Sequence, residues 1–422
     1  MKLNYKQTFL IGFGFFASSI AWSLYNAYVP ILLSNFITST FFIGIVMTFD
    51  NIFGVVFQPL FGALSDKTKS KMGRRMPYIL FGIPICAVAF TIIPLTNSLF
   101  SLIAVLIVFN FVMSVWRAPV VALMPDLTPP SLRSKANGVI NFMGGLGSLF
   151  SFFVGGLLFK LGGMPLPFLC SAVLMVGALL VLKFFVKEDL SLLAQYEEEE
   201  KKEQEKEQEK EQQLQELNDK NKGNPGKSLI FLLFAILFWF TGYNAVETFF
   251  STYVVNTLKD STGAFLNAGD ASMLLAMFSL SFLVFAIPAG FISGKLGRRT
   301  TIIIGLAGVT VIFSVMMLVT DINILRVLLL IGGIFWACVN INSLPMVVEM
   351  AKWKDIGKYT GYYYFFSFSA SIISPILFGF IRDRLVRYDV LFVYSAIAFA
   401  LAIACMTFVR HGEVKKSVEE TA

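Results

Sequence analysis

The stretch from Asp50 to Arg75 reads DNIFGVVFQPLFGALSDKTKSKMGRR. It begins with a carboxylate inside an apolar run. It ends in a loop with five basic residues: Lys67, Lys69, Lys71, Arg74 and Arg75. An acid costs free energy in a lipid bilayer and is usually functional there, whereas basic loops between apolar spans mark the cytoplasmic side. The stretch therefore predicts a membrane protein with an important acid in an apolar span.

The composition of the whole chain also favours a polytopic membrane protein. Of its 422 residues, 56% are hydrophobic and 14% are charged, whereas soluble domains have about 45–50% apolar and about 25% charged residues. The net charge of +7 does not indicate nucleic-acid binding, because most of the cations flank apolar spans. The four cysteines lie in apolar runs and are expected to be reduced packing residues. The single histidine, His411, lies near the C-terminus, so a proton carrier within the membrane must be a carboxylate.

Apolar stretches of about 20 residues, enough to cross ~30 Å of hydrocarbon, predict an all-α membrane protein with twelve transmembrane helices. We expect two six-helix bundles, at 1–186 and 228–410, and a cytoplasmic tail at 411–422. The spans are expected at 8–33, 40–63, 76–95, 98–126, 134–159, 164–186, 228–256, 270–293, 300–319, 323–350, 358–381 and 388–409.

The segment 187–227 is polar and contains the run EEEEKKEQEKEQEKEQQLQEL. This run has no apolar face, so we interpret the segment as a charged cytoplasmic linker, with a docking helix as the alternative. An even number of spans places both termini on one side of the membrane. That side is expected to be cytoplasmic, because it holds most of the basic loops: 64–75, 127–135, 294–299 and 351–358. The basic loop near 382–387 is the exception.

The two halves of the chain resemble each other in order and spacing. Tyr25-Asn26-Ala27 in the first span corresponds to Tyr243-Asn244-Ala245 in the seventh. Gly73-Arg74-Arg75 after the second span corresponds to Gly297-Arg298-Arg299 after the eighth. Further matches pair Lys135 and Gly138 with Lys358 and Gly361, and Pro119 with Pro345. The chain is therefore expected to consist of two parallel six-helix repeats.

The loops GALSDKTKSKMGRR and GFISGKLGRR resemble the G-x-x-x-D-R-x-G-R-R signature of the major facilitator superfamily. The first copy is several residues longer, and the second has Gly294 in place of the acid. With Gln58-Pro59-Leu60 before it and Met76-Pro77-Tyr78 after it, the first copy is similar to sucrose–proton symporters and to the neighbouring glycoside–pentoside–hexuronide–cation symporters. This chain departs from the latter at Gln58, where they carry a second acid. It departs from the former at Arg117, which lies one turn before their arginine.

The resemblance implies a cation-coupled sugar symporter of the cell membrane that works by alternating access about a site between its two halves. Loss of the second acid at Gln58 favours H⁺, because Na⁺ needs several oxygen ligands; Na⁺ is the alternative. We expect a small-molecule substrate, a monomer in the lipid bilayer, no cofactor or metal, and no nucleic-acid partner. The alternatives are an amphiphile efflux antiporter and a non-transporting sensor. An enzyme is not expected, because the sequence has no phosphate-binding loop or metal-ligand cluster.

Two carboxylates within the spans, Asp50 and Glu247, are candidate cation-coupling residues. Loss of hydration disfavours the charged form of such a group, so that it can take up a proton and later release it. Glu247 follows Tyr243 by four residues and therefore shares its helix face. For both acids the alternative is a structural hydrogen bond between helices.

Aromatic, amide and guanidinium side chains in the spans are candidate substrate contacts, because an aromatic ring suits the C–H face of a sugar and the polar groups can bind its hydroxyls. Arg117 stays charged and must face a partner or water, so charge balance with Asp50 or Glu247 is its alternative role. Packing or interface anchoring is the alternative for the aromatic residues. The full set is Trp22, Tyr25, Asn26, Arg117, Tyr243, Asn244, Asn340 and Asn342.

Charged residues at the cytoplasmic helix ends are candidate gate residues. Their ion pairs would hold the inner side closed and break when it opens; an orientation signal alone is the alternative. The set is Asp66, Arg74, Arg75, Asp126, Arg298, Arg299 and Glu349. The glycines of the fifth span are expected instead to allow close helix contact.

Overall fold

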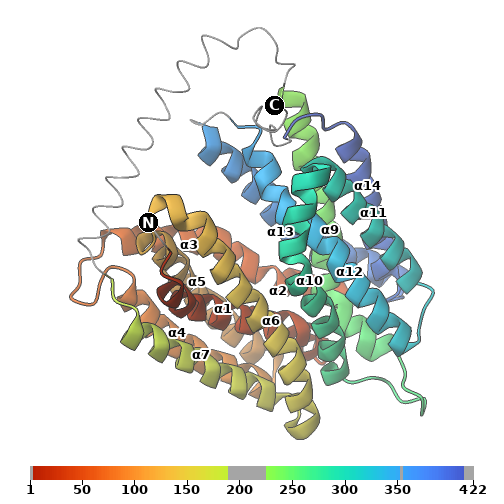
Figure 1. Cartoon of the computed structure of the whole chain (residues 1–422). Helices are drawn as coiled ribbons and strands as arrows, with labels where there is room; N and C mark the ends of the chain where they lie inside the picture. Colours follow the sequence, from red (N-terminus) through yellow and green to blue (C-terminus); the bar gives the residue numbers. More distant parts are fainter. Residues whose placement is uncertain (1–2, 189–224, 352–354, 413–422) are drawn as a thin grey trace. The chain divides into compact units, whose positions relative to one another are not determined.

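The computed structural model describes residues 3–188, 225–351 and 355–412 (Figure 1). Within these ranges the protein is almost entirely helical, and the only strand-like pairing there is an isolated bridge between Lys259 and Phe265. The predicted charged linker and C-terminal tail lie largely outside the described residues. The α-helices are α1 (Tyr5–Ser34), α2 (Thr40–Met47), α3 (Phe49–Lys67), α4 (Met76–Ile92), α5 (Leu99–Asp126), α6 (Arg133–Gly162), α7 (Pro165–Phe185), α9 (Pro225–Thr257), α10 (Ala268–Leu296), α11 (Arg298–Met316), α12 (Ile322–Val348), α13 (Ile356–Leu385) and α14 (Val390–Thr407).

Twelve helices in the described ranges are long and apolar enough to cross a membrane, and α2 and α3 together form one of them. This result confirms the predicted all-α fold with twelve spans. The observed ends lie close to the predicted ones; the second span, predicted to end at 63, continues to Lys67. Polar N-caps explain several starts: Ser39 and Ser98 each accept a hydrogen bond from a main-chain N–H of the first turn of α2 and α5.

The second span has an interruption that the sequence pattern does not predict. α2 ends at Met47, and α3 begins at Phe49. The intervening Thr48 donates its hydroxyl to the carbonyl of Ile45 at 2.7 Å, a side-chain bond that competes with regular helix geometry. As a result, Asp50 lies in the first turn of α3.

The chain divides into two compact units. Unit 1 consists of the described residues within Met1–Gln204 together with Glu247–Ala276 and Pro375–Val386. Unit 2 consists of the described residues within Glu205–Val246, Met277–Ser374 and Arg387–Ala422. The predicted bundles at 1–186 and 228–410, which follow the sequence repeat, stay a prediction.

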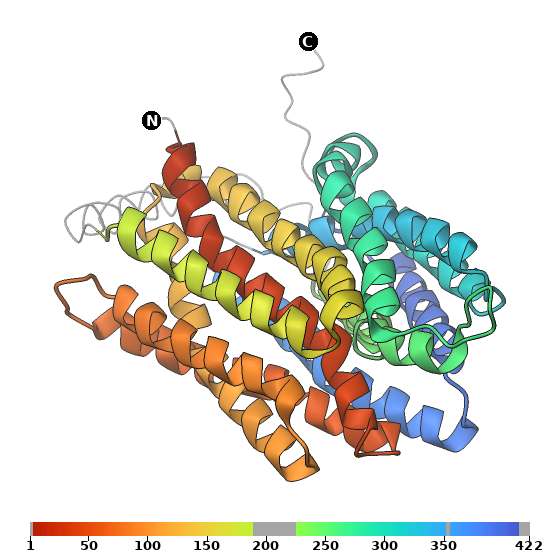
Figure 2. The ribbon, with the colours of Figure 1, turned by 90° about the horizontal axis from the view of Figure 1, so that it is seen from below.

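In unit 1, α1 packs along α6 and α7, as the red and yellow helices of Figure 2 show. Glycines of α6 allow close contact with α1 and with α10. A Cβ at Gly147 would lie 2.6 Å from the carbonyl oxygen of Phe16, and one at Gly156 would lie 2.7 Å from that of Gly269. Larger side chains there would force the helices apart, in agreement with the role expected of these glycines.

Polar contacts join Glu247–Ala276 and Pro375–Val386 to the rest of unit 1. Lys160 at the end of α6 pairs with Asp270 at the start of α10, with 2.7 Å between Nζ and Oδ1. Asp383 of α13 accepts three hydrogen bonds at the start of α2: from the Ser39 hydroxyl (2.6 Å) and the main-chain N–H groups of Thr40 (2.8 Å) and Phe41 (3.1 Å). The Asp383 contacts lie at the start of the second span, at the opposite end from the loop that holds Arg74 and Arg75. The Lys160–Asp270 pair joins the end of α6 to the start of α10.

Candidate functional site

Three charged residues of unit 1 come together from three spans. Asp50 of α3 interacts electrostatically with Glu247 of α9 and with Arg117 of α5. Asn51 donates hydrogen bonds to the Asp50 carboxylate from its main-chain N–H (2.6 Å) and its side-chain amide (2.7 Å). The predicted cation-coupling acids and the predicted arginine therefore share one site.

α1 supplies the aromatic and amide neighbours of these charges. The Asn26 side chain hydrogen-bonds with the Glu247 carboxyl group, and Arg117 Cζ lies 5.6 Å from the ring centroid of Trp22. Six residues selected from the sequence thus meet, and we refer to them as the charged cluster: Trp22, Tyr25, Asn26, Asp50, Arg117 and Glu247. The apolar spans hold two acids and one arginine here, an arrangement that is costly unless the charges serve one another or a ligand.

Tyr25 is the most enclosed member of the charged cluster. Its side chain is 0% exposed and stacks on Phe109 with 5.6 Å between ring centroids. The side-chain amide of Asn110 donates to the Tyr25 hydroxyl at 3.2 Å. Sequence reasoning missed Asn110, although it is a lone amide in an otherwise apolar part of α5. Its Oδ1 and the Trp22 indole N–H are buried without a hydrogen-bond partner.

The remaining predicted substrate contacts lie in unit 2. Tyr243 of α9 stacks on Trp336 of α12, with 4.3 Å between centroids and 1° between ring planes. The amides of Asn244 and Asn342 donate to carbonyls one turn earlier in their own helices, those of Phe240 (2.7 Å) and Cys338 (2.9 Å). Asn340 lies half-buried on α12. Their contact with a substrate stays a prediction, and Trp336 is an aromatic partner that sequence reasoning missed.

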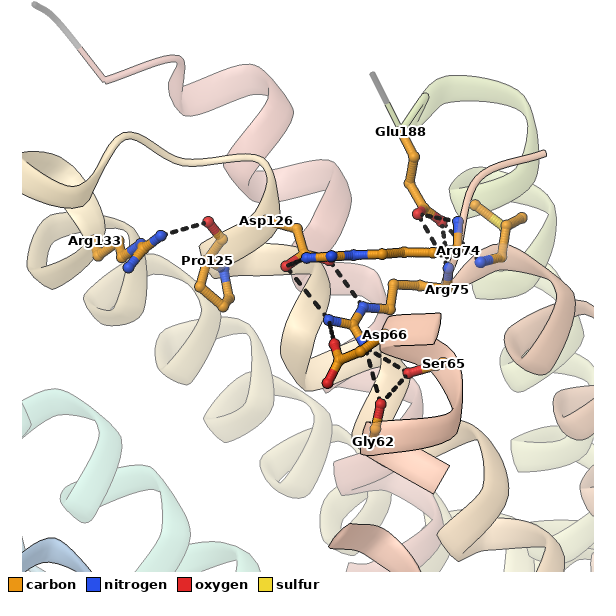
Figure 3. A network of polar contacts seen from close by, with 10 residues as sticks. Gly62, Ser65, Asp66, Arg74, Arg75, Pro125, Asp126, Arg133 and Glu188 are labelled. Atoms are coloured by element: carbon orange, nitrogen blue, oxygen red, sulfur yellow. Dashed lines mark hydrogen bonds and ion pairs between the residues drawn. The ribbon is translucent and has the colours of Figure 1, made fainter. Parts of the chain in front are cut away.

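A second group of charges lies at the junction of α3, α4 and α5 (Figure 3). Asp126 binds both arginines of the Arg74–Arg75 pair: it accepts from Arg74 Nη2 at 2.7 Å and from Arg75 Nε at 2.8 Å. Arg75 also pairs with Asp66 and donates to the Gly62 carbonyl at 3.2 Å. The Arg75 and Asp126 side chains are 5% and 8% exposed. We call Asp66, Arg74, Arg75 and Asp126 the arginine cluster.

The second repeat forms a weaker version in unit 2. Arg298 pairs with Glu349 at 3.2 Å, and the Glu349 side chain is 41% exposed. Arg299 donates to the carbonyls of Met406 (3.3 Å) and Thr407 (3.1 Å) at the end of α14. Arg74 thus pairs with a carboxylate at the end of α5, and the corresponding Arg298 pairs with one at the end of α12. The carboxylate is buried in the first repeat and exposed in the second.

Among the described residues, no group of three or more His, Cys, Asp and Glu side chains could hold a metal ion. The two acids have amide neighbours: Asn51 lies beside Asp50, and Asn26 lies beside Glu247. Chemically, the charged cluster can exchange a proton and can offer hydrogen bonds and an aromatic surface to a solute.

Comparison with known proteins shows which family the chain matches. Residues 11–269 and 263–422 match the model of the Major Facilitator Superfamily. The hexuronate transporter of Bacillus subtilis (strain 168) is 22% identical over 411 residues, which cover 90% of this chain and 89% of that protein. An uncharacterized symporter of Synechocystis sp. is 29% identical over 140 residues, which cover 30% of this chain and only 26% of that protein.

Solved structures share the fold at low identity. A nucleoside transporter has a TM-score of 0.69 at 16% identity, over 96% of this chain and 100% of that one. A peptide transporter in complex with sulfate has a TM-score of 0.70 at 13% identity, over 96% and 93% of the two chains.

Proposed function

Since the chain belongs to the major facilitator superfamily, we propose that it is a secondary active transporter that couples the movement of a sugar to that of a cation, H⁺ or Na⁺. The family match and the hexuronate-transporter relative confirm the resemblance predicted from the loop signature. The protein is a multi-pass membrane protein of a transporter family, and its predicted lack of enzymatic activity agrees with that membership.

The charged cluster is the observation that carries this proposal. Asp50 interacts electrostatically with Glu247 and with Arg117, which come from two other spans, and each of these charges would be costly alone in an apolar segment. A proton bound to Asp50 changes the charge that faces Arg117. Proton uptake and substrate binding at one cluster would thus be coupled through charge. H⁺ is the preferred cation, because one carboxylate suffices to bind it.

A sugar is the proposed substrate for two reasons. The cluster combines the half-buried ring of Trp22 with amide and guanidinium groups, which suit the C–H and hydroxyl faces of a pyranose. A relative at 22% identity is a hexuronate transporter, so the substrate panel should include sugar acids beside neutral mono- and disaccharides. Arg117 would be the natural partner of a sugar carboxylate.

We further propose that the protein resides in the cell membrane as a monomer with both termini in the cytoplasm, and that it works by alternating access. In this orientation the arginine cluster and the Arg298–Glu349 pair lie at the cytoplasmic helix ends, where they would serve as gate contacts. The contacts of Asp383 and of Lys160 with Asp270 would then lie at the outer ends of their helices.

The decisive experiment is uptake into proteoliposomes from a panel of labelled sugars and sugar acids, each with a pH gradient, a Na⁺ gradient or no gradient. We expect at least one sugar to accumulate only with an inward proton gradient. Accumulation that depends on the Na⁺ gradient would identify Na⁺, instead of H⁺, as the coupled cation. Failure of every sugar, together with outward movement of an amphiphile, would identify an efflux antiporter instead.

Replacing Asp383 by alanine is expected to loosen the contact between α13 and α2. The change removes three hydrogen bonds at a helix start, worth about 1–2 kcal/mol, and so raises the population of the open contact roughly five- to thirtyfold. The measurement is the rate at which a membrane-impermeant thiol reagent labels a Thr40→Cys reporter, which is buried in the intact contact (1% exposed), in a background without the native cysteines. Asp389→Ala is the matched control, because Asp389 lies six positions later in the sequence and pairs with Arg387. Equal labelling rates in both variants would argue against the role of Asp383.

A further inference from the structure

Glu188 is a carboxylate that the sequence patterns did not single out. It follows the end of α7 by three positions, and its side chain reaches the start of α4 (Figure 3). It accepts hydrogen bonds from three consecutive main-chain N–H groups: Arg74 (2.7 Å), Arg75 (3.0 and 3.1 Å) and Met76 (2.7 Å). The first N–H groups of a helix have no acceptor within the helix, and the positive end of the helix dipole favours a negative charge there.

Gly73 makes room for this carboxylate. Its φ of 100° lies in a region of backbone conformation that residues other than glycine rarely adopt. A Cβ at this position would also collide with the Glu188 side chain. The glycine of the Gly73-Arg74-Arg75 motif is therefore required twice, once for the turn and once for the approach of Glu188.

The residues whose main chain binds Glu188 are the ones whose side chains bind Asp126. Arg74 and Arg75 donate from their backbone to Glu188 and from their guanidinium groups to Asp126. One carboxylate thus holds the backbone of the pair and the other holds its side chains. A guanidinium fork binds a carboxylate well only when its approach is correct, so backbone placement at Arg74 and Arg75 affects both ion pairs.

We propose that Glu188 is a positioning residue of the arginine cluster. By capping the start of α4, it orients Arg74 and Arg75 toward Asp126 and ties the end of α7 to the junction of α3, α4 and α5. Its effect on transport rests on the proposed function, in which the arginine cluster takes part in the conformational cycle. Its effect on the structure of the loop does not depend on that function.

The structural arm of the test is hydrogen–deuterium exchange of the full-length protein in detergent or nanodiscs. In Glu188→Ala we expect the peptide that contains Arg74, Arg75 and Met76 to exchange roughly five- to tenfold faster than in the wild type. Glu188→Gln keeps one acceptor oxygen and should show a smaller increase. Lys187→Ala, at an exposed neighbouring position, should exchange as the wild type does. Unchanged exchange of this peptide in Glu188→Ala would overturn the proposal.

The functional arm is a double-mutant cycle with Asp126→Asn, measured as the maximal rate and KM of uptake. If Glu188 acts through the arginines, Glu188→Ala lowers the maximal rate and leaves KM unchanged, and it adds little once Asp126 is replaced. Fully additive losses would mean that Glu188 acts elsewhere and would overturn the proposal. Faster exchange without any transported sugar would instead count against the proposed function alone, so the two failures are distinguishable.

Discussion

Replacement of Asp50 by asparagine is expected to abolish concentrative uptake while exchange of substrate across the membrane continues. Asparagine has almost the same shape as a protonated aspartate but cannot release a proton. A proton symporter with one proton per sugar can accumulate substrate about tenfold for each unit of pH gradient, since 1.4 kcal/mol corresponds to a factor of ten. We therefore expect the accumulation ratio to fall from about ten to about one under a one-unit gradient.

The measurement is the accumulation ratio in proteoliposomes, with counterflow exchange measured in the same preparations. Asp321→Asn is the matched control, because Asp321 is an exposed acid that only caps the start of α12. Wild-type accumulation by Asp50→Asn would contradict a coupling role for this residue. It would leave Glu247, which lies within electrostatic reach of Asp50, as the remaining acid of the charged cluster.

The variant Glu247→Gln distinguishes the role of Glu247 in proton coupling from that of Asp50. Glu247 hydrogen-bonds with Asn26, whereas Asp50 is bonded by its neighbour Asn51. If only Asp50 carries the proton, Glu247→Gln should raise KM and retain accumulation. Loss of accumulation in both variants would mean that the two acids titrate as a coupled pair.

Replacement of Arg75 by alanine is expected to destabilise the protein more than any other change at the helix-end arginines. The Arg75 and Asp126 side chains are 5% and 8% exposed, and loss of one partner from a buried ion pair costs about 3–5 kcal/mol. Arg74 also binds Asp126 and compensates in part, so we expect about 3 kcal/mol. The measurement is the midpoint of thermal unfolding in detergent, which should fall by several degrees.

Arg298→Ala is the matched control in the second repeat. Its partner Glu349 is 41% exposed, and ion pairs open to solvent contribute about 0–1 kcal/mol. The unfolding midpoint of Arg298→Ala should therefore stay close to that of the wild type. Equal losses in the two variants would show that burial does not distinguish the two repeats. Arg75→Lys should recover part of the stability, because lysine restores the charge but not the planar fork.

The twelve-span, all-α fold could be predicted from the sequence. Long apolar runs predict the twelve spans because a bilayer leaves a spanning chain almost no alternative to a helix. The loop motif with Arg74 and Arg75 predicted the family through a pattern that is local in sequence. Asp50 and Glu247 could be selected from the sequence because an ionisable residue in an apolar run is conspicuous without any structure.

Which of these residues are partners is visible only in the folded chain. The meeting of Asp50, Arg117 and Glu247 depends on how three helices far apart in sequence pack, and no local pattern encodes that packing. Glu188 was missed because it lies among ordinary surface charges at the edge of a polar segment, and its importance comes from main-chain N–H groups more than a hundred positions earlier. The residues of the stretch from Asp50 to Arg75, and Asp126, could thus be selected from the sequence. The contact of Asp126 with both arginines and the role of Glu188 emerged only from the folded chain.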